Sequence, residues 1–488
     1  MPGAQLDRRG SIVTHRIWPF LLLIAASCAS PPPVRPPATR VEIPGEWRAG
    51  STAAEDESVS WWNLLGSAAL DSLVAEGLER NPSLDGAAAR IDAAVARAKI
   101  AGAGSWPQLG VGGSGSRSKR SFVGFPSFGP PGGGDEGPIS VESSTFGVSL
   151  DLSWEVDLWG RIRSGQSAAF ADAQMAEALW RGARSSIAGQ ICKAFFGVVE
   201  ADQQAELAEA TSANRAEMLE RIEARYARGL RSSLDVHRAR AELESSKART
   251  ALRCAQRDSA RRQLEILLGR YPSASIDVRL LPDPPERLPA GLPADLIDRR
   301  LDLVAAERAV AAADRRRAEA RRALYPRVML TGSSGTTSDE LGDLSDGDFA
   351  VWSIGASISQ PLFQGGRIVA GIDAADAGLR EALANFATTA LQAYAEVESA
   401  LDAETRLGEQ VRALANAVEA SSLALRLAET RYSGGLADVL VLLDAQRSDH
   451  DARSRLIEAT RQRLDNRVNL HLSLGGGFRR DDESRNPS

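Results

Sequence analysis

An internal duplication limits the folds open to this chain more than any other feature. At a constant offset of 206 positions, residues 146–269 align with residues 352–475 without a gap. A Gly-Arg-Ile-x-x-Gly segment and an Arg-Tyr-x-x-Gly-Leu segment recur in both halves. Conserved spacing over such a length indicates that each half builds the same supersecondary unit. We expect a first repeat at 67–270, a linker at 271–298 and a second repeat at 299–475.

Each repeat contains a segment in which apolar and polar residues alternate. From Phe146 to Leu158 the even positions are apolar, and the odd positions are Gly, Ser, Asp or Glu. This period of two predicts a strand with one apolar and one polar face. The four expected strands lie at about 107–118, 146–158, 326–338 and 351–360. The intervening loops, 119–145 and 339–350, are rich in Gly, Pro, Ser and Asp, and we expect them to be mobile.

Strands of this kind are typical of membrane β-barrels, whose outer face is apolar and whose inner face is polar. Four strands are too few, because the smallest closed barrels need about eight. An open sheet edge in lipid would leave backbone groups without hydrogen-bond partners. The chain is therefore predicted to oligomerise. A dimer would give eight strands and a trimer twelve, and the periodicity does not choose between them.

Each strand pair is followed by a very long stretch with helical composition and no proline. The first runs from about residue 162 to 227 and the second from 367 to 432. At 1.5 Å per residue, each predicted helix is about 100 Å long. Its many charged residues exclude burial in lipid, and its narrow apolar stripe indicates packing as in a coiled coil. Glycine turns at tips near 225–231 and 431–437 then lead into returning helices at 231–268 and 437–473.

The N-terminus has the order of a secretory signal. Basic residues precede an apolar stretch at 17–26, which ends in Ser27-Cys28. We expect 1–27 to be a signal peptide and Cys28 to be the acylated first residue of the mature protein, with ordinary cleavage nearby as the alternative. Residues 28–66 would form a proline-rich tether, and 476–488 a disordered tail.

The composition excludes several classes of protein. Acidic residues outnumber basic ones by 64 to 58, and only 5% of residues are aromatic, which argues against nucleic-acid binding. No apolar run reaches the ~18 residues of a membrane-spanning helix. The four histidines and three cysteines are too scattered for a metal cluster. Cys192 and Cys254 would lie about 20 Å apart along the hairpin, too far for a disulfide.

Three motifs suggest chemistry, but each has a simpler interpretation. Gly110–Gly115 fits the dinucleotide pattern G-x-G-x-x-G, yet it lies inside an expected strand and opens no helix. Asp151, Glu155 and Asp157 fall on the polar strand face; a watery lumen is favoured over a hydrolase pair. The arginines within 315–322 favour a solvated helix face over an RNA site. We therefore predict no catalytic residue, cofactor or metal, and a protein that is not an enzyme.

The two glycine turns are the most informative positions. They contain the residues Arg225, Tyr226, Gly229, Leu230, Arg431, Tyr432, Gly435 and Leu436. After the second turn, Leu440, Asp444 and Arg447 are spaced four and three apart, so they share one face of a helix. An exposed ion pair at a capped helix start would explain the last two equally well.

Several segments resemble one known family. They include Trp154–Arg161, Arg300 with Asp302, Tyr325-Pro326, both Arg-Tyr turns and Leu442–Arg447. These segments are similar to those of the TolC/OprM family of outer-membrane factors, in its NodT-like lipoprotein branch, and the similarity covers almost the whole mature chain. The chain departs from the family pattern at Leu301, where similar proteins usually have proline.

This resemblance implies an α+β membrane protein that assembles as a homotrimer. Twelve strands, four per chain, would form an outer-membrane β-barrel, continued by a long periplasmic helical barrel. The trimer would be the passive exit duct of a tripartite efflux system for drugs and toxic compounds, joined by a periplasmic adaptor to an inner-membrane pump of the resistance-nodulation-division type.

The resemblance also assigns roles to residues. Leu440, Asp444 and Arg447 would constrict the periplasmic end, and the eight turn residues named above would dock the adaptor. Alternative functions are a type I protein-secretion duct or a lipid-anchored coiled-coil scaffold. The alternating strands favour a channel over the scaffold.

Overall fold

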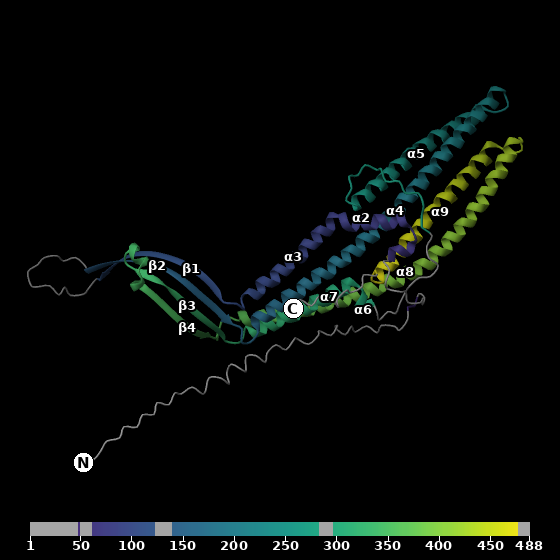
Figure 1. Ribbon diagram of the computed structural model, residues 1–488. Helices are drawn as coiled ribbons and strands as arrows, with labels where there is room; N and C mark the ends of the chain where they lie inside the picture. Colours follow the sequence, from purple (N-terminus) through teal and green to yellow (C-terminus); the bar gives the residue numbers. More distant parts are fainter. Residues whose placement is uncertain (1–46, 49–60, 123–138, 283–295, 477–488) are drawn as a thin grey trace, which may run out of the picture. The chain divides into compact units, whose positions relative to one another are not determined.

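A computed structural model describes residues 47–48, 61–122, 139–282 and 296–476. The predicted signal peptide 1–27, Cys28 and the tail from 477 onwards lie outside these residues. The described elements are helical except for one sheet (Figure 1). In chain order they are η1 (Trp61–Leu65), α2 (Ala68–Arg80), α3 (Pro82–Ala103), β1 (Gln108–Phe122), β2 (Ile139–Val156), α4 (Arg161–Ala227), α5 (Ser233–Leu267), α6 (Leu296–Arg299), α7 (Leu301–Arg322), β3 (Arg327–Ser338), η3 (Leu341–Ser345), η4 (Gly347–Phe349), β4 (Ala350–Ser359), α8 (Arg367–Ser433) and α9 (Val439–Ser473).

The duplicated sequence builds duplicated helical hairpins. Helices α4 and α8 each have 67 residues, and α5 and α9 each have 35. Both long helices begin after a glycine in the left-handed region, Gly160 at φ 75° and Gly366 at φ 83°. None of the described helices combines the length and the apolarity required to cross a membrane.

Both hairpins turn by the same hydrogen-bonded motif. Gly229 has φ 72° and Gly435 has φ 76°. The Leu230 N–H donates to the Arg225 carbonyl at 3.0 Å, and the Leu436 N–H donates to the Arg431 carbonyl at 2.8 Å. These are the six-to-one bonds of a Schellman motif, which requires a left-handed residue and therefore favours glycine. A Ser232–Asp235 capping box then starts α5.

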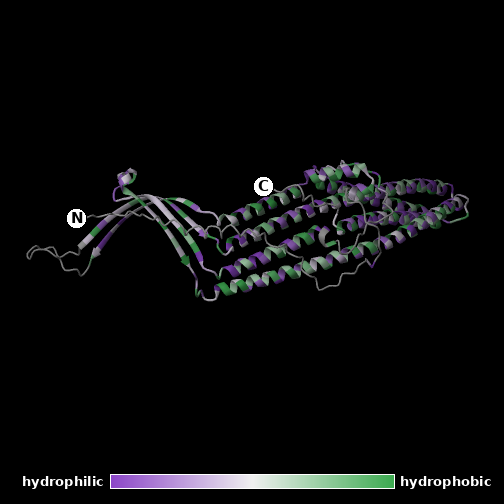
Figure 2. Cartoon of the chain, turned by 60° about the horizontal axis from the view of Figure 1, so that its bottom comes forward, coloured by the Kyte–Doolittle hydropathy of each residue, from purple (hydrophilic) through white to green (hydrophobic). Residues whose placement is uncertain are grey.

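The four strands form one antiparallel sheet in the order β1-β2-β3-β4. Leu152 lies opposite Leu109 and Gly332, and Trp154 lies opposite Leu330. On the other face, Asp151 lies opposite Gly110 and Ser333. The register thus gathers apolar residues on one face and polar residues on the other, which confirms the predicted period of two. The alternation is visible as mixed colours along the strands in Figure 2.

The strand ends differ from the expected ones. Strand β2 begins at Ile139, although the alternating pattern predicted a start at 146, and β1 continues to Phe122. The predicted mobile loop 119–145 therefore contains paired strand on both sides of 123–138, which lie outside the described residues. The predicted mobile loop 339–350 contains the short helices η3 and η4. The G-x-G-x-x-G segment is inside β1, as expected, and every residue of it pairs with β2.

Two aromatic contacts fasten the sheet to the helices. The Trp154 indole N–H donates to the Ser105 carbonyl at 2.9 Å, and the Trp159 indole N–H donates to the Pro326 carbonyl at 2.8 Å. The Trp159 ring also stacks on Tyr325, with ring centroids 5.2 Å apart. Because each bond joins the end of β2 to the segment before another strand, the junctions of both repeats are held together.

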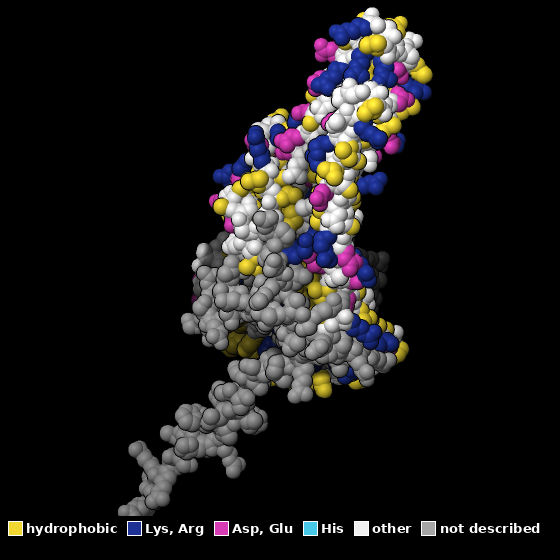
Figure 3. Space-filling view, turned by 90° about the vertical axis from the view of Figure 1, so that its right-hand side faces the viewer, with side chains coloured by type: hydrophobic (Ala, Val, Ile, Leu, Met, Phe, Trp, Pro, Cys, Tyr) yellow, Lys and Arg dark blue, Asp and Glu magenta, His cyan; other side chains and the backbone are white. Residues whose placement is uncertain are grey.

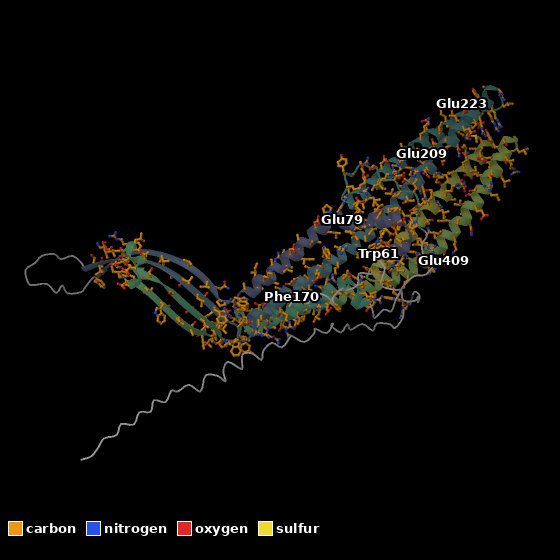
Figure 4. All side chains as sticks on the ribbon, in the orientation of Figure 1. Trp61, Glu79, Phe170, Glu209, Glu223 and Glu409 are labelled. Atoms are coloured by element: carbon orange, nitrogen blue, oxygen red, sulfur yellow. The ribbon has the colours of Figure 1, made fainter. Side chains whose placement is uncertain are left out.

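The helices share buried cores. Trp61, labelled in Figure 4, lies in a cluster that joins η1 and α2 to α4, α5 and α9. A second cluster joins α7 to α8, and a third lies near the hairpin tips. Cys192 is buried and Cys254 is half-buried, and both are free thiols. Burial raises the pKa of Cys192 to about 12, so it remains a protonated core residue.

The basic cluster of α7 contacts acidic residues of two neighbouring helices. Arg316 forms an ion pair with Asp172 of α4. Arg317 and Arg321 both pair with Asp376 of α8, at 2.5 and 3.3 Å. These side chains hold the pKa of the Asp376 carboxyl below its usual range. The expected solvated helix face is therefore a set of cross-links between three helices.

We predict opposite effects for two glycine-to-alanine changes. At Gly269, which has φ +70°, a Cβ atom would lie 2.5 Å from the Arg80 carbonyl oxygen. Gly269→Ala should lower the free energy of unfolding by about 1–3 kcal/mol, because both the backbone and the contact are strained. The control, Gly197→Ala inside α4, meets nothing within 4 Å and should raise it by up to about 1 kcal/mol. Thermal unfolding followed by circular dichroism measures both; equal midpoints would contradict the prediction.

Candidate functional site

The tips of the two hairpins are packed against each other. Buried apolar residues of α4 and α5 contact buried residues of α8 and α9 there. They are Met218, Leu219, Ile222, Val236, Ala239, Leu243, Ala428, Tyr432, Val439 and Leu442. The surface around this cluster has interspersed charges of both signs (Figure 3). One example is the 2.7 Å ion pair of Arg240 with Glu223, which is labelled near the tip in Figure 4.

Tyr432 is the centre of this contact. Only 4% of it is exposed, and the guanidinium carbons of Arg225 and Arg231 each lie 5.1 Å from its ring centroid. Arg225 also donates to the Tyr432 and Ser433 carbonyl oxygens at 3.5 and 3.4 Å. The Arg231 guanidinium nitrogen Nη1 lies 3.9 Å from the Asp438 carboxylate oxygen Oδ1. Two cations of the first hairpin thus hold one ring of the second by cation–π attraction.

The other expected docking residues are placed differently from Tyr432. Tyr226, Leu230 and Leu436 are exposed, Leu436 by as much as 80%. Gly229 and Gly435 form the turns themselves. A partner approaching the tips in this conformation would meet these exposed side chains, whereas the ring of Tyr432 is covered.

The predicted gate residues share one exposed face of α9. Leu440 is 48% exposed, and the Asp444 and Arg447 side chains are 69% and 67% exposed. An Arg447 N–H donates to an Asp444 carboxylate oxygen at 2.5 Å. Val439 and Leu442 point into the tip core. The spacing therefore placed the three residues on one face correctly, and within one chain the two charges form an ion pair.

The predicted acidic residues, Asp151 and Glu155 of β2 and Asp157 just after it, have distinct surroundings. Asp151 accepts from Ser149 and Ser333 at 2.7 and 2.8 Å on the polar face. Glu155 pairs with Arg161 at 2.8 Å. Asp157 lies just beyond the strand, where it accepts from the backbone N–H groups of Ile162 and Arg163 and so caps α4. Glu155 and Asp157 therefore both bond to residues in the first turn of α4.

A cleft of about 1270 Å³ lies between α4, α7, α8 and α9. Its charged side chains bind each other. Arg300 pairs with Asp302 at 2.7 Å and with Glu396 at 2.6 Å, and it also donates to the Ser473 carbonyl. In the described part of the chain no three His, Cys, Asp or Glu side chains converge as metal ligands.

Sequence reasoning missed Arg231 and the burial of Tyr432. Arg225 and Tyr432 each have an identical residue at the equivalent position of the other repeat. Arg231 does not, because its equivalent position is Ala437. The presence of this arginine in only one of the two repeats is the sequence feature that could have identified it. It indicates a contact in which the two tips play unequal parts.

Comparison with known proteins identifies the class. Residues 73–270 and 292–476 match the family model "Outer membrane efflux protein". Outer membrane protein OprJ of Pseudomonas aeruginosa is 31% identical over 473 residues, which cover 96% of each chain. Cation efflux system protein CusC of Escherichia coli is 27% identical over 474 residues, covering 95% of this chain and 99% of CusC.

Solved structures agree with this result. The outer-membrane channel OprN is 29% identical and superposes with a TM-score of 0.81 over 92% of this chain and 99% of OprN. The open state of the MtrE outer membrane channel of Neisseria gonorrhoeae is also 29% identical, with a TM-score of 0.76 over 91% of this chain and 97% of MtrE.

A four-stranded sheet with two free edges, continued by paired long hairpins, defines one protomer of an outer-membrane channel. The chain belongs to the outer membrane efflux protein family. This membership confirms the predicted resemblance and the predicted fold, a trimer with a twelve-stranded barrel and a periplasmic helical barrel. It settles the choice between dimer and trimer, and it replaces the scaffold alternative with an efflux channel that works with an adaptor and an inner-membrane pump.

We predict that the ring of Tyr432, and not its hydroxyl, joins the two tips. The hydroxyl is buried and lacks a hydrogen-bond partner among the described residues. Tyr432→Leu should therefore weaken the contact by about 1–2 kcal/mol, whereas Tyr432→Phe keeps the cation–π contacts and should not. Hydrogen exchange of the peptide 225–236 measures this. Exchange should accelerate in the leucine variant only; equal acceleration in both variants would assign the contact to the hydroxyl.

Proposed function

We propose that this trimer is a passive duct for small toxic molecules, closed at its periplasmic end by Leu440, Asp444 and Arg447. One observation supports the gate assignment. The three side chains share an exposed face of α9 beside the tip core, and none of them belongs to the buried cluster. With threefold symmetry, three Asp444 and three Arg447 side chains come together in one ring. Each carboxylate can then accept from the arginine of its own chain and from that of a neighbour.

The energy of such a ring suits a gate. An exposed ion pair contributes only about 0.2–1 kcal/mol. Three ion pairs and three leucine contacts therefore stabilise the closed tunnel over the open one by a few kcal/mol. Binding of an adaptor to the exposed tip residues Tyr226, Leu230 and Leu436 supplies enough free energy to shift the equilibrium to an open state. Arg225, Arg431, Gly229 and Gly435 shape the turns that present these side chains.

The cargo is set by the pump. Relatives of 27–30% identity, matched over nearly their whole length, are named for the efflux or export of cations, solvent, toluene or pyoverdine. Such different cargoes on one scaffold support a duct with little selectivity. We assign the chain no enzymatic activity and no cofactor. The acidic residues Asp151, Glu155 and Asp157 would line or border the aqueous lumen, and acylated Cys28 would anchor the N-terminus in the outer membrane.

The gate is tested by conductance in planar lipid bilayers. The double variant Asp444→Ala, Arg447→Ala should raise the resting conductance of the reconstituted trimer severalfold, because the ring loses all six charges. The matched control is Asp402→Ala, Arg406→Ala, which removes an equally exposed ion pair of α8, 3.7 Å long, away from the tips. An unchanged resting conductance in the Asp444, Arg447 variant would contradict the gate, as would an equal rise in the control.

A further inference from the structure

The apolar face of the sheet ends abruptly, and its end marks the depth of the membrane. From Val156 back to Phe146, every even position of β2 is apolar. These ten steps span about 33 Å along the strand, or about 25 Å along the membrane normal at a tilt of about 40°. That height equals the ~25 Å apolar band of outer-membrane barrels. Phe146, whose ring lies over Gly115 of β1, is thus at the rim of the band.

Three charged residues continue the same face directly beyond this rim. In the register, Arg117 lies opposite Ser144, and Lys119 lies opposite Glu142. They are the only charged residues on the outward face of the four strands; Arg120, Arg327, Asp151 and Glu155 are on the other face. In Figure 2 this end of the β1–β2 hairpin is more hydrophilic than the middle of the sheet.

The three side chains form a compact cluster with one excess positive charge. Glu142 accepts from Arg117 at 3.0 Å and lies 3.5 Å from the Lys119 ammonium group. The Arg117 side chain is 76% exposed and that of Lys119 is 59% exposed. A guanidinium has five N–H donors and an ammonium has three, so each cation keeps donors beyond those used by Glu142.

We propose that Arg117 and Lys119 bind the phosphate headgroup of an anionic lipid in the outer leaflet. The cluster stands on the lipid-facing side at headgroup depth, where its donors meet phosphate oxygens, and arginine matches phosphate with two parallel hydrogen bonds. Strand β2 continues past the end of β3, because Phe146 is opposite Ser338, the last residue of β3. The hairpin therefore carries the cluster beyond the edge of its neighbour, where lipid can reach it. Three copies would surround the barrel with three such sites.

The test uses the full trimer reconstituted in phosphatidylcholine vesicles that contain spin-labelled phosphatidylglycerol or spin-labelled phosphatidylcholine. Electron paramagnetic resonance gives the fraction of each lipid that the protein immobilises. The wild type should prefer phosphatidylglycerol, and the preference should weaken as salt is raised. The double variant Arg117→Ser, Lys119→Ser should lower the preference for phosphatidylglycerol, by about fivefold for each cation removed at low salt.

Inorganic phosphate added at equal ionic strength should leave this preference unchanged, because the site binds the phosphate of a lipid held in the bilayer.

Two further variants separate this site from general charge. Arg120→Ser removes a cation from the same strand but from the other face, and it should leave the preference unchanged. Glu142→Gln should increase it, because the carboxylate no longer competes for the donors. The proposal is overturned if the Arg117, Lys119 variant keeps the wild-type preference, if Arg120→Ser lowers the preference as much, or if inorganic phosphate abolishes it. Conductance of each variant shows that the trimer is intact, so failure of the channel and failure of the lipid site are distinguished.

Discussion

The backbone hydrogen bonds of two strand edges determine how this protein assembles. Within one chain β1 pairs only with β2, and β4 pairs only with β3. About half of the backbone groups of β1 and β4 therefore point away from the sheet without a partner. Lipid offers them no hydrogen bond, so the only stable solution is closure with other copies of the chain. Oligomerisation, the lumen and the ring of hairpins below it all follow from this requirement, and membership of the family sets the number of copies at three.

The two ends of the protomer are built with different strengths. At the strand–helix junction, indole hydrogen bonds, helix capping by Asp157 and the arginines of α7 fix several elements together. At the tips, the hairpins share a small apolar core and the ring of Tyr432. A gate needs two arrangements that differ by only a few kcal/mol. Placing the weak contacts at the tips would confine movement to that end of the protomer.

Much of the fold could be predicted from the sequence, because it depends on local periodicity. The alternation after Phe146 gave the strand faces, and the Gly229 and Gly435 turns gave the hairpins. The sequence did not predict the start of β2 at Ile139, because residues 143–145 are all polar and the alternation in Ile139–Glu142 has the opposite phase to that after Phe146. It also did not give the partners of Arg317 or Tyr432, which come from helices distant in sequence. The roles of Asp444 and Arg447 require neighbouring chains, and so they stay predictions.

Closure between β4 of one copy and β1 of the next is the central claim, and cross-linking tests it most directly. In a Cys254→Ser background, Val111→Cys on β1 is combined in turn with cysteine at the outward positions of β4, which are Ala350, Trp352, Ile354, Ala356 and Ile358. Within one chain β1 and β4 lie at opposite edges of the sheet, so a bond between them must join two chains. Oxidation in the outer membrane should give, for at least one pair, a covalent ladder that ends at three chains. A ladder that ends at two chains, or no cross-link at any of the five positions, would contradict the account.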